Sequence, residues 1–184
     1  TTASAKGHFN TNSYSVTINA STIAYVGGIA GNSTSVAEGV VEVFDYSITA
    51  PTTYFGGIIA KTTANAKGDV TANEVTIIAS KEAFVGGIAG YAANISDSSV
   101  TIALIDVEGD AYIGGIVGQA THTVSNSNAD IAINNIIEIK IKLGYVGGIA
   151  GKIGSNVFAS ITDCEAVVDI TAVSKLDGNY FIGG

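Results

Sequence analysis

The sequence of 184 residues predicts an all-β fold, a parallel β-solenoid (β-helix) of about six coils with roughly 30 residues per coil and almost no helix. Two observations predict it. A short glycine-rich motif recurs along the whole chain, and runs of Val, Ile and Thr separate its copies. We therefore expect residues 1–184 to form a single repeat domain.

The recurring motif, called the marker below, is an aromatic residue, an aliphatic or aromatic residue, and then Gly-Gly-Ile. The first glycines of successive copies are 29, 30, 28, 33 and 36 residues apart, so one structural unit is reused, with extra residues in the last two copies. The sixth copy ends after its two glycines. The marker aromatics are Tyr25, Tyr54, Phe84, Tyr112, Tyr145 and Phe181.

The segments between markers predict strands that stack in parallel. Runs such as 99–107 and 129–133 nearly alternate and are rich in Val, Ile and Thr. A unit of about 30 residues cannot bury its own apolar face, and stacking at about 4.8 Å per coil gives a rod about 30 Å long. Turn signals are found at residues 67–69, 108–110 and 177–179 and at Pro51.

The marker aromatics are expected to stack as a structural ladder. The alternative is a sugar-binding strip, which we disfavour because Tyr and Phe interchange and the marker carries no flanking polar groups. Both faces of the marker strand are apolar. A strand with one wet face should alternate apolar with polar residues, so both faces must be covered, by a second layer of the same coil or by a neighbouring molecule.

Charge limits the partners. The chain has eight Lys, no Arg and 16 acidic residues, with a net charge of −8. Phosphate binding draws on clustered Lys and Arg, so we expect no nucleic acid partner and no attraction to an anionic membrane surface. No apolar run approaches the roughly 18 residues of a spanning helix, so no membrane insertion is expected.

One marker and the strand after it resemble a known family. The residues 112–118, Tyr-Ile-Gly-Gly-Ile-Val-Gly, followed by 124–129, Val-Ser-Asn-Ser-Asn-Ala, are similar to the GLUG repeat of large bacterial and some eukaryotic surface proteins. The likeness covers nearly the whole chain. It implies a β-solenoid with an adhesive or spacer role at the cell surface. Ala60 stands where the other complete markers end in Gly, which predicts a locally altered corner.

We assign no catalytic, cofactor-binding or metal-ligating residue, expect no cofactor, and do not expect an enzyme. His8 and His122 are isolated, with no partner at metal-ligand spacing. Cys164 is expected to be a small half-buried residue in a strand, in preference to a reactive thiol or an intermolecular bridge.

The sequence contains two local groups of acidic residues and one aligned column rich in Thr. We interpret both acidic groups as solvated turns, and weak calcium binding by the group at 106–110 is the remaining alternative. An ice-binding array would need a regular Thr column, and the alignment gives one broken by Glu and Ala. The acidic groups are Asp106, Glu108 and Asp110, and Asp163, Glu165 and Asp169. The aligned column is Thr17, Glu42, Thr76, Thr101, Ala132 and Thr171.

The leading hypothesis is an extracellular structural rod that self-associates into a filament, head to tail and also laterally, or forms a surface stalk. The alternative is an adhesin module that binds a host protein or glycan through loops, for which the expanded coils at 134–144 and 154–175 are the candidates. A carbohydrate-active β-helix enzyme is a third hypothesis. Three sequons, at Asn19, Asn32 and Asn94, agree with secretion.

The two chain ends support the filament hypothesis. Neither end carries a cap that would protect an open strand edge, and residues 1–7 closely match residues 62–68, which follow a marker. We therefore expect either an excerpt of a longer array or chains that stack head to tail.

Overall fold

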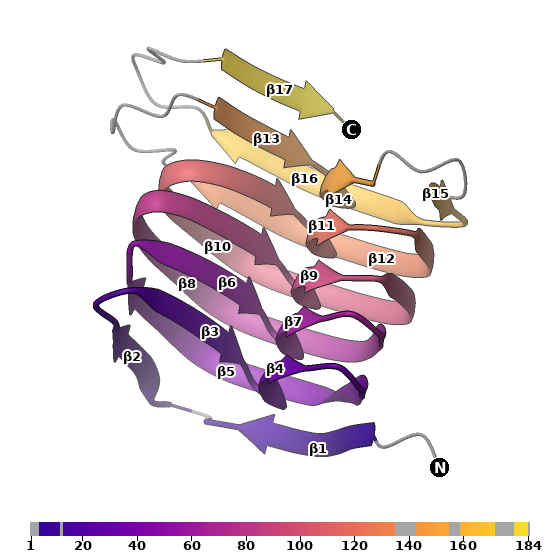
Figure 1. The fold of residues 1–184 in the computed structure, drawn as a ribbon, viewed down its shortest axis with the longest axis horizontal. Coiled ribbons are helices and arrows are strands. Elements are labelled where there is room, and N and C mark those ends of the chain that lie inside the picture. The colour runs from indigo at the N-terminus through magenta and orange to yellow at the C-terminus, as the bar shows by residue number, and fades with distance from the viewer. Residues whose placement is uncertain (1–3, 12, 135–142, 155–158, 172–178, 184) are drawn as a thin grey trace.

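The computed structural model describes residues 4–11, 13–134, 143–154, 159–171 and 179–183. Within these ranges every regular element is a strand and there is no helix. The strands stack into a β-solenoid of about five turns, each turn lying directly on the one before it (Figure 1). The predicted fold class is therefore confirmed.

The strands, in chain order, are β1 (Ser4–Asn10), β2 (Ser15–Asn19), β3 (Ile23–Gly27), β4 (Ala30–Ser33), β5 (Val36–Thr49), β6 (Thr52–Gly56), β7 (Ile59–Thr62), β8 (Asn65–Gly86), β9 (Ala89–Ala92), β10 (Asn94–Gly114), β11 (Val117–Ala120), β12 (Thr123–Asn134), β13 (Leu143–Gly147), β14 (Ala150–Ile153), β15 (Ser160–Thr162), β16 (Glu165–Thr171) and β17 (Asn179–Gly183).

Each full turn supplies a long strand, a marker strand and a short strand, and every pairing between turns is parallel. The long strands and the marker strands belong to one sheet of 12 strands. The marker ladder in this sheet runs through β3, β6, the ends of β8 and β10, β13 and β17. The short strands form a second sheet in the order β14-β11-β9-β7-β4.

The pairing places like residues on like residues. In the marker ladder Tyr25 pairs with Tyr54, and each later marker aromatic pairs with the next. The ladder continues through the Gly-Gly-Ile corner, where the N–H of Gly28 donates to the carbonyl of Gly57 at 2.7 Å. Because no corner breaks the hydrogen bonding, the register of one turn sets the register of the next.

Two predicted turns are bends inside strands. Gly68 lies within β8 with φ +146°, and Gly109 lies within β10 with φ +116°, a region that favours glycine. A Cβ on either residue would lie about 2 Å from a carbonyl oxygen of the preceding turn. The signals at 67–69 and 108–110 are thus corners that the ladder passes through, while residues 177 and 178 lie outside the described ranges.

The core fills the space that the three ladders enclose. Ile58, Ile88 and Ile116, the isoleucines of three successive markers, are fully buried one above another. Burying one such side chain stabilises the fold by about 1.5–3 kcal/mol. Tyr46 is the polar member of a core column that otherwise holds Val and Ile. Its buried hydroxyl has no hydrogen-bond partner.

The altered corner expected at Ala60 is not present. Ala60 is fully buried, and β7 keeps the same register with β4 below it and β9 above it. The structure accommodates the extra methyl group without a shift in pairing. This prediction was wrong because one Cβ can be accepted where the paired strands stay aligned.

Candidate functional site

The marker aromatics form one continuous stack of six rings. Neighbouring ring centroids are 4.7 to 5.2 Å apart, and the ring planes differ by 4° to 13°. Each contact of this kind contributes about 0.5–1.5 kcal/mol beyond the area it buries. The predicted structural ladder is confirmed.

The stacking leaves little ring face for a ligand. Phe84 is 6% exposed because Tyr54 and Tyr112 cover its two faces at 4.7 and 4.9 Å. Sugars stack on ring faces, and the inner rings of this ladder offer only their edges. Within the described residues, only Tyr25 and Phe181, at the two ends of the stack, have a face with no ring against it.

Polar side chains do flank the rings, although the marker itself has none. They come from the short strands, at the fourth residue after each second marker glycine, and pair in one column. The Nζ atom of Lys61 lies 4.9 Å from the centre of the Tyr54 ring, and that of Lys152 lies 5.4 Å from the centre of the Tyr112 ring. The column is Asn32, Lys61, Tyr91, Gln119 and Lys152.

The sequence pattern missed this column because its residues differ from turn to turn. Their constant distance from the marker glycines was the available signal. On the other side of the rings, Glu82 pairs with Asp110, each two residues before a marker aromatic. The ring edges therefore lie between a mostly cationic or amide column and a pair of carboxylates.

Burial and these carboxylates act on the tyrosines. Burial raises the pKa of Tyr54 and of Tyr112 above the ordinary value, and the Glu82 carboxylate raises both further. Both phenols therefore stay protonated at neutral pH and can donate hydrogen bonds from the stack.

The short strands cover the aromatic face of the marker strands. A Cβ on Gly31 would lie 2.9 Å from the Tyr25 carbonyl oxygen, and one on Gly118 would lie 2.6 Å from the Val85 nitrogen. Backbone thus packs closely on backbone at these two glycines, where a Cβ would be crowded. Of the two covers expected for this face, a second layer of the same coil is the one that the structure contains.

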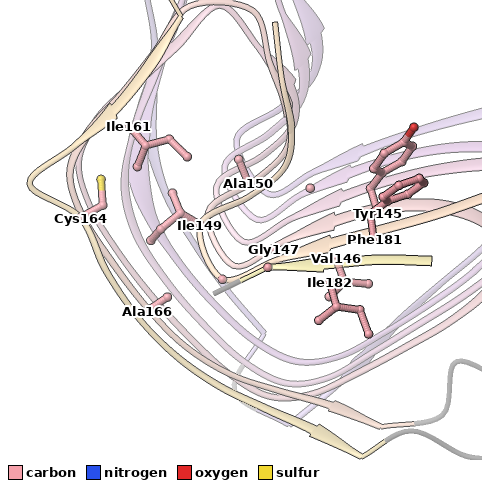
Figure 2. A pocket seen from close by; sticks show the side chains of 13 residues that line it. Tyr145, Val146, Gly147, Ile149, Ala150, Ile161, Cys164, Ala166, Phe181 and Ile182 are labelled. Carbon is pink, nitrogen blue, oxygen red and sulfur yellow. The ribbon is translucent and has the colours of Figure 1, made fainter.

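An open pocket of about 800 Å³ lies at the C-terminal end of the stack (Figure 2). Val146 and Ile182 point into the turn, on the strand face opposite Tyr145 and Phe181. Ile182 is 56% exposed. The pocket is the apolar interior of the last described turn, without a further turn over it.

The two histidines lie far apart in the stack and do not form a site together. His8 on β1 is exposed, with Nε2 3.9 Å from a Glu42 carboxylate oxygen. His122 precedes β12, and its Nδ1 is 3.0 Å from the Thr121 hydroxyl. The part of the chain that the structure describes holds no group of three side chains able to bind a metal ion.

The first acidic group lies on a strand and not in a turn. Asp106, Glu108 and Asp110 alternate with buried residues along β10, so all three face outward. Burial raises the pKa of Asp106, and Glu74 on the neighbouring turn and Glu108 raise it further. The turn interpretation failed because β10 continues through its bend at Gly109.

The second acidic group is divided between a corner and a strand. Asp163 has φ +52° and turns the chain before β16, at the position that Asp97 and Asn126 occupy in earlier turns, both also with positive φ. Glu165 and Asp169 are exposed on β16. The turn reading therefore holds for Asp163 alone.

Cys164 takes a serine position. Its Sγ lies 3.2 Å from the carbonyl oxygen of Thr162, and the hydroxyls of Ser98 and Ser127 each donate to the carbonyl two residues earlier at 2.8 Å. The side chain is half-buried and reduced. The expected half-burial is confirmed, but Cys164 lies between β15 and β16 and not within a strand.

The aligned Thr column is wrong. Its members belong to different columns, because Thr17 pairs in register with Ser47 and Thr76, whereas Glu42 pairs with Thr71 and Thr101, nearer the start of each long strand. The two true columns are each mixed in chemistry. They read Asn10, Glu42, Thr71, Thr101, Asp130 and Val167, and Thr17, Ser47, Thr76 and Asp106.

The three sequons differ in access. Asn19 and Asn32 are exposed. Asn94 is half-buried, its Nδ2 donates to Asn65 Oδ1 at 2.9 Å, and its Oδ1 accepts from the Thr123 N–H at 3.1 Å. Glycosylation at Asn94 would remove this bridge between turns, whereas Asn19 and Asn32 could carry a glycan.

No family model, curated protein or solved structure matches this chain. A search of the described residues for a helix that is long and apolar enough to span a membrane found none. The similarity to the GLUG repeat therefore remains a hypothesis based on the motif. The expanded coil at 134–144 lies largely outside the described ranges, whereas the one at 154–175 is described at 154 and 159–171 and contains β15 and β16.

Proposed function

We propose that the chain is an extracellular structural rod, a β-solenoid that self-associates into a filament or forms part of a surface stalk. One observation carries the proposal: three parallel ladders run from turn to turn, so the surface of each turn is a template for another. The motif's resemblance to surface-protein repeats and the two exposed sequons support an extracellular location.

The last described strand has an edge on which a further turn fits. Phe181 is 55% and Ile182 is 56% exposed on β17, which pairs with β13 among the described residues. A further turn, from the same polypeptide or from a second copy, would bury these side chains and continue the strand pairing.

The purified 184-residue chain tests this by light scattering after size exclusion and by electron microscopy at rising concentration. We expect rods that lengthen, with an axial repeat of about 30 Å or a multiple of it. Ile182→Lys should block end-to-end growth. Val167→Lys is the matched control, since Val167 is 59% exposed but lies on the outward face of β16. A wild-type monomer at every concentration would refute self-association.

An adhesin is the second candidate. The observation in its favour is the line of tyrosine edges flanked by Lys61, Gln119 and Glu82, which presents donors and acceptors at one-turn spacing. Binding to a glycan array or to host extracellular matrix that is lost in Lys61→Ala would support it.

A further inference from the structure

The aromatic ladder contains two tyrosine pairs, which one phenylalanine separates. Tyr25 stacks on Tyr54 with centroids 5.2 Å apart and planes 11° apart, and Tyr112 stacks on Tyr145 at 5.1 Å and 8°. Phe84 lies between the pairs, and Phe181 lies beyond Tyr145. Each tyrosine of the second pair thus has only one tyrosine neighbour in the stack.

We propose that these pairs are sites of oxidative cross-linking, at which a haem peroxidase with hydrogen peroxide joins neighbouring turns through dityrosine. The inference does not depend on the proposed rod or adhesin role. It depends on parallel, in-register stacking, which holds the two phenol rings of each pair face to face. Their outer edges reach solvent, since Tyr25 is 36% exposed and the other three tyrosines are half-buried.

The chemistry balances with one peroxide per link. Each phenol gives one electron and one proton to the peroxidase, and the hydrogen peroxide is reduced to two waters. The two phenoxyl radicals join through ring carbons ortho to the oxygens. The hydrogens on those carbons then move to the oxygens, which restores two phenols and leaves the product lighter by two hydrogen atoms.

The protonated state of the phenols suits this route. Both Tyr54 and Tyr112 have a pKa above the ordinary value, so each reacts as a neutral phenol that gives up its proton together with its electron. Other tyrosines differ in setting. Tyr46 is 2% exposed against Phe55, and Tyr14 is 79% exposed, with no ring stacked on it in the described residues.

The second pair has a clean readout, because trypsin cuts after lysine and separates Tyr112 in fragment 82–140 from Tyr145 in fragment 143–152. Dilute protein is treated with horseradish peroxidase and hydrogen peroxide, and the monomer is recovered and digested. We expect a linked species with the summed mass of the two fragments less two hydrogens, together with dityrosine fluorescence. The first pair should appear as a loss of two hydrogens within fragment 7–61.

Tyr145→Phe should remove the 82–140 to 143–152 link without harming the fold, since the ladder already holds phenylalanine at two positions. Tyr14→Phe is the control and should leave that link intact. Unfolding in denaturant before oxidation should abolish the preference for these partners. Links found only between chains or only through Tyr14 or Tyr91, or a link that survives Tyr145→Phe, would overturn the proposal. A cross-linked monomer should also unfold at a higher denaturant midpoint.

Discussion

The marker corners and the outward face of the long strands are built on the same ladders but follow different rules. At the corners every turn repeats glycine, glycine and isoleucine, and the atoms of one turn touch those of the next. On the outward face one column runs from Asn10 through Glu42 and Thr101 to Val167. Positions that contact the next turn therefore keep the same residue type, whereas positions that face solvent vary.

This difference teaches where variation is informative. The corner residues repeat because they pack against the next turn, so their repetition is not evidence for a ligand-binding site. Columns that vary beside a fixed corner, such as the one that contains Lys61 and Lys152, are the places where a function can be added without disturbing the stack.

The largest expected effect is at a marker glycine. A Cβ on Gly56 would lie 2.3 Å from the Ile59 oxygen and 2.4 Å from the Ala89 Cα, so Gly56→Ala should cost about 4 kcal/mol or more and prevent folding at 37 °C. Gly183 is the same marker position with nothing within 4 Å. Gly183→Ala should therefore fold normally by circular dichroism, and equal damage from both would contradict the contact argument.

The next comparison uses two adjacent isoleucines. Ile77 is fully buried and Ile78 is 41% exposed. We expect Ile77→Ala to lower the free energy of unfolding by about 2–5 kcal/mol, because it leaves a cavity in a column that is closed above and below. Ile78→Ala should cost less than about 1 kcal/mol. Urea unfolding followed by tyrosine fluorescence measures both, and similar costs would show that strand facing is misassigned.

A smaller effect, of opposite sign, is expected at Tyr46. Its hydroxyl is buried without a partner, so Tyr46→Phe should raise the free energy of unfolding by about 1 kcal/mol. Tyr14→Phe, on the exposed loop, should change nothing. A loss of stability in Tyr46→Phe would mean that the hydroxyl has a partner, such as a buried water.

The same residue predicts a pH dependence. Burial raises the pKa of Tyr46 to about 12. A pKa above the ordinary value of about 10 means that this contribution to stability is complete below pH 10 and is lost as pH rises through 12, because in this window the phenol ionises more readily in the unfolded chain. We expect Tyr46→Phe to flatten the alkaline unfolding curve in this window, leaving the part due to Tyr54 and Tyr112.

The smallest effect is expected on the surface. Glu38 lies 2.7 Å from the Lys6 ammonium and 3.4 Å from that of Lys67, and its pKa is lowered chiefly by the hydrogen bond from Lys6. The contribution of the Glu38 carboxylate to folding stability is present above the ordinary pKa of a glutamate and is lost as the pH falls below it. Because the carboxylate faces water, Glu38→Gln should not shift the thermal midpoint measurably at physiological salt. A clear shift would show that this ion-pair ladder does bind the turns together.

The sequence predicted the features that turn-on-turn contact repeats: the solenoid, its period, the aromatic stack and the need for a second covering layer. It did not predict that the bends at Gly68 and Gly109 lie within strands, because a turn signal is the same whether or not pairing continues through it. The Thr column failed because each long strand carries several Thr, Ser or Glu positions, and only the pairing between turns shows which of them share a column.

The candidate site was only partly visible in the sequence. The rings belong to the repeat, but Lys61, Tyr91 and Lys152 come from the strand after each corner and share no residue type. Only the folded path of the chain shows that the short strand returns beside the rings of the marker strand.

The Gly-Gly-Ile corner also has a direction along the stack. At the corner of Gly28, Ile29 and Ala30, three successive N–H groups all donate to carbonyls of the following turn. Other corners point the opposite way, since the N–H groups of Lys81 and Thr121 donate to the preceding turn. A molecule that continues the stack has to match both kinds of corner, and it can do so only in the same orientation. A filament built in this way would be vectorial, and a reagent specific for one end would mark a single tip of each fibre.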